Sequence, residues 1–122
     1  MLAIDTKYLI HDKHGKIYIA DINRITDTTI TVTNYCDQLN MYVSSVSTHS
    51  MPLDWVVDYT CMSDLICGNR FRFWKKDGHT FDANLKSYGN YHLHVNQTDE
   101  NNPRMETIMP IFDIVKFKMV EL

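Results

Sequence analysis

Residues 7–33 read KYLIHDKHGKIYIADINRITDTTITVT, and residues 70–96 read RFRFWKKDGHTFDANLKSYGNYHLHVN. The two stretches align without a gap, so that Gly15 falls on Gly78 and Ala20 falls on Ala83. Few residues are identical, but apolar residues recur at the same places in both stretches. This self-similarity predicts that one structural unit occurs twice in the chain.

A second pair of blocks follows with a shorter spacing. Residues 51–62 read MPLDWVVDYTCM and residues 109–120 read MPIFDIVKFKMV, with Met-Pro at both starts. The change of spacing predicts an insertion in the first copy between its third and fourth strands, where loops tolerate extra residues.

Apolar residues mostly alternate with polar ones, and β-branched and aromatic residues are frequent, which favours an all-β fold. The Asp77-Gly78 turn supplies the positive φ of a tight hairpin. We expect strands at 6–13, 16–25, 28–35, 41–49, 55–62, 70–77, 79–88, 91–97, 104–109 and 113–121. The domains are then 1–62 and 70–122, joined by a linker at 63–69. A helix over 52–66 is the alternative, with Pro52 in its first turn.

The second copy resembles Sm-like small barrels, a group with SH3-like architecture. The resemblance rests on these residues: Phe71, Phe73, Gly78, Phe81, Ala83, Leu85, Leu93 and Val95. It implies two tandem five-stranded SH3-like (Sm-like) small barrels packed closely together. The family's RNA-binding loop has an Asp-x-Met-Asn pattern, whereas residues 27–30 read DTTI and residues 89–92 read GNYH. We therefore do not transfer the family's RNA-binding residues.

The composition restricts the function. The chain has 122 residues, a net charge of −3 and a pI near 6.0, which does not favour a non-specific nucleic-acid binder. No apolar run reaches the length of a membrane helix, and no secretory signal is recognisable. Cys36, Cys61 and Cys67 lack a C-x-x-C spacing, which predicts free, partly buried thiols in the cytoplasm.

Recognised catalytic motifs are missing, because the sequence contains no G-x-S-x-G, P-loop or H-E-x-x-H pattern. We expect a protein that is not an enzyme and has no cofactor and no metal. His92 and His94 have a spacing that can chelate zinc, but no further ligands can be assigned from the sequence.

Strand alternation assigns an inner and an outer face to each copy. In the first copy the expected inner residues are Tyr8, Ile10, Tyr18, Ala20, Ile22, Ile30 and Val32. Leu9, Ile17 and Ile19 then form an apolar outer face, which either packs on the other copy or binds a partner. With Tyr35 and Tyr42 from an apolar loop, they are the candidate partner interface.

The second copy offers a candidate ligand site of aromatic and basic residues that can stack on a base and neutralise a phosphate. We assign these residues to it: Arg72, Trp74, Lys75, Tyr91, His92 and His94. A solvated hairpin with one partly covered tryptophan is the alternative.

The leading hypothesis is a non-enzymatic intracellular binding module that engages a protein partner. Short chains of this style are typical of phage or mobile-element proteins that block or sequester a host component, which would place it in the host cytoplasm. The alternative is binding of RNA, DNA or a nucleotide through the aromatic-basic patch. We expect no membrane partner, and a homo-oligomer is a further option.

Overall fold

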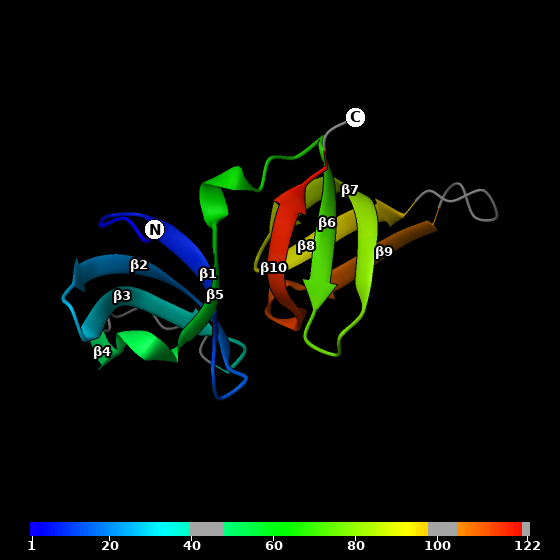
Figure 1. Ribbon diagram of the computed structural model, residues 1–122. Helices are drawn as coiled ribbons and strands as arrows, with labels where there is room; N and C mark the ends of the chain where they lie inside the picture. The colour runs from blue at the N-terminus through cyan, green and yellow to red at the C-terminus, as the bar shows by residue number, and fades with distance from the viewer. Residues whose placement is uncertain (40–47, 98–104, 121–122) are drawn as a thin grey trace. The chain divides into compact units, whose positions relative to one another are not determined.

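The computed structural model describes residues 1–39, 48–97 and 105–120, and the chain divides into two units, Met1–Ser63 and Asp64–Leu122 (Figure 1). The division falls at the start of the expected linker at 63–69. Each unit is built mainly of antiparallel strands. The all-β prediction with two similar units is therefore confirmed.

The elements of the two units follow one another in the same order. The first unit contains β1 (Lys7–Asp12), β2 (Ile17–Ile25), β3 (Thr29–Asp37), β4 (Thr48–Pro52), the 3₁₀ turn η1 (Leu53–Trp55), β5 (Val56–Cys61) and the 3₁₀ turn η2 (Met62–Asp64). The second contains β6 (Arg70–Lys75), β7 (Thr80–Gly89), β8 (His92–Gln97), β9 (Met105–Pro110), the 3₁₀ turn η3 (Ile111–Asp113) and β10 (Ile114–Met119).

The expected strands match these elements closely, except that most of the strand expected at 41–49 lies outside the described residues. The alternative helix over 52–66 does not form. Strand β5 occupies its centre, because its β-branched and aromatic residues favour an extended backbone. None of the helical turns in the described ranges has the length or apolar character needed to cross a membrane.

The two units share their strand order and their pairing register. The sheets run β4-β3-β2-β1-β5 and β9-β8-β7-β6-β10. Tyr8 pairs with Ala20 as Phe71 pairs with Ala83. The last strand of each unit also pairs in the same register. Phe117 pairs with Phe73 in the second unit, and Tyr59 pairs with Ile10 at the equivalent position of the first unit. The repeat predicted from the sequence is therefore a repeat of backbone pairing.

Both sheets are open, which corrects the expected closed barrels. Strands β4 and β5 lie at opposite edges of the first sheet, and their described residues form no ladder with each other. Pro52 ends β4 without an N–H donor, and η1 then carries the chain across. Three residues span only about 10 Å, so the sheet is strongly curled although hydrogen bonds do not close it.

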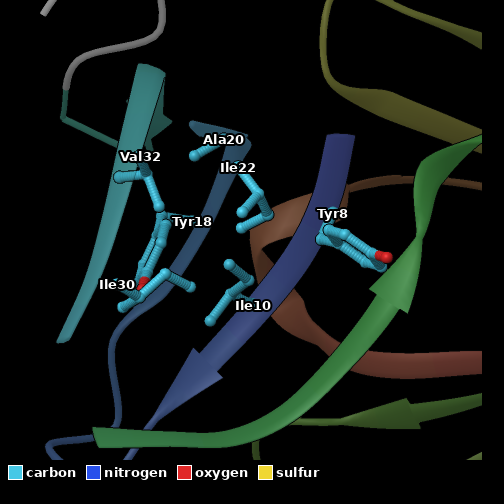
Figure 2. Packing of buried hydrophobic residues seen from close by; sticks show 7 residues of the cluster. All are labelled: Tyr8, Ile10, Tyr18, Ala20, Ile22, Ile30 and Val32. Atoms are coloured by element: carbon cyan, nitrogen blue, oxygen red, sulfur yellow. The ribbon is translucent and has the colours of Figure 1, made fainter. Parts of the chain in front are cut away.

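The core of the first unit is the inner face of its sheet (Figure 2). It consists of the seven residues that alternation predicts: Tyr8, Ile10, Tyr18, Ala20, Ile22, Ile30 and Val32. In the second unit the expected inner residues are also buried, except that Phe81 is half-buried. Phe71, Phe73 and Phe117 pack ring against ring there, with centroids 5.9–6.4 Å apart.

The first hairpin turn of each unit depends on one glycine. Gly15 has a φ of 80° and Gly78 a φ of 94°, in the left-handed region that favours glycine. Each glycine N–H donates to the carbonyl three residues earlier, which closes the turn. The positive φ expected at the Asp-Gly turn is confirmed.

Candidate functional site

The outer face of β6 and β10 carries half of the lysines and arginines of the second unit. Trp74 pairs with Lys116 and Arg72 pairs with Lys118, and paired residues lie on the same side of a sheet. Arg70, two residues before Arg72, shares that side. We call Arg70, Arg72, Trp74, Lys116 and Lys118 the basic face. It joins four cations in a chain whose net charge is −3.

A groove lies along the basic face where β10 (the red strand in Figure 1) meets β6. Its volume is about 350 Å³, and it is lined by Arg72, Trp74, Lys118, Met119 and Val120. A second hollow shares Met119 and Val120 and is lined in addition by Gly68, Asn69, Arg70 and Asn84. Cations, an aromatic ring and side-chain amides therefore line one continuous stretch of surface.

The guanidinium of Arg72 already holds an anion. Its Nε donates to Oδ1 of Asp82 at 2.9 Å and its Nη2 donates to Oδ2 at 3.2 Å, which is the two-pronged geometry of arginine with carboxylate or phosphate. These hydrogen bonds, assisted by the charges of Arg72 and Arg70, hold the pKa of Asp82 below its ordinary value. Asp82 therefore stays ionised at neutral pH beside the groove.

Trp74 is half-buried and lines the groove. The Nζ of Lys116 lies 4.8 Å from its ring centroid, a cation–π contact. This contact restrains the ring, so less conformational freedom is lost when a flat group stacks on it. The ring shares the groove with Arg72 and Lys118 and therefore suits a ligand that joins a planar group to negative charge.

Four of the six ligand residues expected from the sequence do not line the groove. Lys75 alternates onto the opposite side of β6, where its Nζ lies 3.7 Å from Asp77 Oδ2. His92 and His94 lie on β8, which β7 separates from β6. Tyr91 has a φ of 62° and packs its ring on Phe112, with centroids 5.8 Å apart. Arg72 and Trp74 are the two that come together.

The two histidines take different partners. His92 Nδ1 lies 2.9 Å from the carbonyl oxygen of Asn90, and His94 Nε2 lies 3.4 Å from Oε2 of Glu106. Within 1–39, 48–97 and 105–120, no three His, Cys, Asp or Glu side chains gather closely enough to hold a metal ion. Cys61 and Cys67 are free thiols, but Cys67 is exposed rather than partly buried, and Cys36 is buried.

The structure differs most from the sequence prediction at the candidate partner interface of the first unit. Leu9, Ile17 and Ile19 are buried, with at most 7% of their surface exposed, so they do not present an exposed apolar face. Tyr35 is half-buried, and its hydroxyl donates to Asp37 Oδ2 at 2.8 Å. Tyr42 lies outside the described residues. Strand alternation had correctly placed the three residues opposite the inner core, but alternation does not show what covers a face.

Lys116 and Lys118 were missed in the sequence. The signal for them was present in β10, where IVKFKM alternates two lysines with the inward Phe117. Placing them beside Arg72 and Trp74 required the pairing of the last strand with the first, which joins residues more than 40 positions apart.

Comparisons with known proteins name no family. No family model matches the chain, and no curated protein matches it.

Proposed function

We propose that this protein is a non-catalytic binding module whose second unit binds single-stranded nucleic acid in the β6–β10 groove. The observation that carries the proposal is that Trp74 lines one groove together with the cations Arg72 and Lys118. Proteins that bind single strands combine a positive groove for phosphates with aromatic rings on which bases stack. An acidic peptide would use the cations but would gain little from the ring.

The net charge of the whole chain is negative, but a ligand responds first to the charges near its site. Arg72 and Lys118 line the groove and Arg70 lines the adjoining hollow, so these three cations lie where a ligand would bind. Asp82 on the neighbouring strand is the ion-pair partner of Arg72.

We keep the cytoplasm as the proposed location, supported by the free thiols of Cys61 and Cys67, which are typical of a reducing compartment.

The test is fluorescence anisotropy with a fluorescein-labelled oligothymidylate and its oligouridylate counterpart. Binding should weaken steeply with salt, with a slope of about −0.7 for each neutralised phosphate. Trp74→Ala should weaken binding about fivefold to a hundredfold, the usual value of one stacked base. Trp55→Ala, which changes the tryptophan of the first unit, is the matched control and should leave the affinity unchanged.

Two outcomes would refute the proposal. One is a lack of binding at low salt by the folded wild-type protein. The other is equal binding of inorganic polyphosphate and oligonucleotide with no effect of Trp74→Ala, because charge alone would then explain the affinity.

A second candidate is a protein partner that adds an extended segment to β5. This strand is an outer strand of the first sheet, and Val57 and Tyr59 on it are 55% and 41% exposed. Exposed edge strands pair with strands of other chains. Such binding would be insensitive to salt and to Trp74→Ala, and Val57→Lys would abolish it.

A further inference from the structure

We propose that Asp82 acts as an internal competitor for the phosphate that Arg72 binds. This inference rests on the proposed function and adds a residue that sets the strength of that site. Asp82 and Arg72 are direct partners across β6 and β7. The carboxylate therefore stands where a phosphate would meet the same guanidinium.

The geometry supports the substitution of one anion for another. Both Asp82 oxygens accept hydrogen bonds from Arg72, and this two-pronged contact is the one that guanidinium also makes with phosphate. After Arg72, the second cation whose charge lowers the pKa of the Asp82 carboxyl is Arg70, two residues earlier on the same side of β6. A phosphate that displaces Asp82 would thus lie against Arg72 and close to Arg70. Lys118 lies on the opposite side of Arg72, on β10.

The pair lies at the surface, so exchange of anions is physically accessible. The side chains of Arg72 and Asp82 are 49% and 28% exposed. Exposed ion pairs contribute little to stability, so a ligand phosphate can replace one. The carboxylate lowers affinity for any ligand with few phosphates, while a ligand with several phosphates offsets that cost. We infer that Asp82 restricts the groove to polyanionic strands.

The prediction is that Asp82→Asn binds labelled oligothymidylate about two- to fivefold more tightly than the wild type, the equilibrium equivalent of one exposed ion pair. The matched control is Glu106→Gln. Like Asp82→Asn, it removes one negative charge and breaks one exposed ion pair, here with Lys86. Glu106 lies on β9, at the edge of the sheet opposite β10 and far from the groove. Its effect should be less than half as large.

A double-mutant cycle distinguishes competition for Arg72 from the general effect of removing one negative charge. With Arg72→Ala already present, Asp82→Asn should bring no more gain than Glu106→Gln, because the competitor has lost its cation. A gain that persists without Arg72 would overturn the inference, as would equal effects of Asp82→Asn and Glu106→Gln.

Different outcomes refute the inference about Asp82 and the proposed function on which it rests. If the wild type does not bind oligonucleotide while Asp82→Asn does, the competitor is confirmed and the proposed function is refuted. If both bind equally, the inference fails and the proposed function stands. If neither binds, both are refuted. Thermal unfolding of each variant checks that the fold is intact.

Discussion

The two units place the same strands in the same register, yet their outer faces are opposite in character. In the first unit the row across β5, β1 and β2 is Thr60, Leu9 and Ile19, and in the second it is Lys118, Arg72 and Asp82. Leu9 is fully buried whereas Arg72 is largely exposed. The backbone pairing is the same, so the difference lies in the side chains and in what surrounds them.

The comparison shows which parts of a repeated unit are constrained. The inner residues stay apolar in both copies, because each curled sheet needs them to form its core. The outer residues do not contribute to that core, so one copy can hold buried leucine and isoleucine where the other holds arginine and aspartate. The second unit is therefore the unit in which we expect a ligand site.

Exchanging residues between equivalent positions should give the largest effects. Leu9→Arg would place a charge without a partner at a fully buried position and should destabilise the protein by about 3 kcal/mol or more. Arg72→Leu should leave the urea midpoint nearly unchanged but weaken oligonucleotide binding. Urea denaturation, monitored by circular dichroism, gives the unfolding midpoint of each variant. Similar midpoints for the two variants would contradict the proposed difference between the two outer faces.

The equivalent glycines should behave alike. Gly15→Val and Gly78→Val should each destabilise the protein by about 1–3 kcal/mol, since a β-branched residue is strained at positive φ. No atom lies within 4 Å of an added Cβ at either position, so backbone strain is the cause. Gly89 has equal space and no positive φ, and Gly89→Val is the control. A neutral Gly78→Val would contradict the shared hairpin.

The smallest effect concerns the titration of Asp82. Its pKa is lowered in the folded state, so its stabilising contribution is present above the ordinary aspartate pKa and is lost as the pH falls through the folded value. Arg72→Leu should raise this pKa towards the ordinary value, which NMR of the carboxyl carbon measures. The equivalent residue of the first unit, Ile19, does not titrate. An unchanged pKa would show that Arg72 is not its main partner.

Much of the fold follows from the sequence because alternation and turn chemistry are local. The seven inner residues of the first unit and the two turn glycines were predictable in this way. The groove was only half predictable, because Lys118 reaches Arg72 through pairing between the two ends of the unit. The burial of Leu9 was not predictable, because alternation assigns a residue to a face of the sheet but does not show whether that face is covered.

NMR titration of the two tryptophan indole N–H signals with oligothymidylate tests the central claim most directly. The chain has two tryptophans, Trp55 in the first unit and Trp74 in the second, so each signal reports on one unit. We predict that the Trp74 signal shifts progressively as oligonucleotide is added while the Trp55 signal stays in place. A shift of Trp55 alone, or of neither signal, would contradict the assignment of binding to the β6–β10 groove.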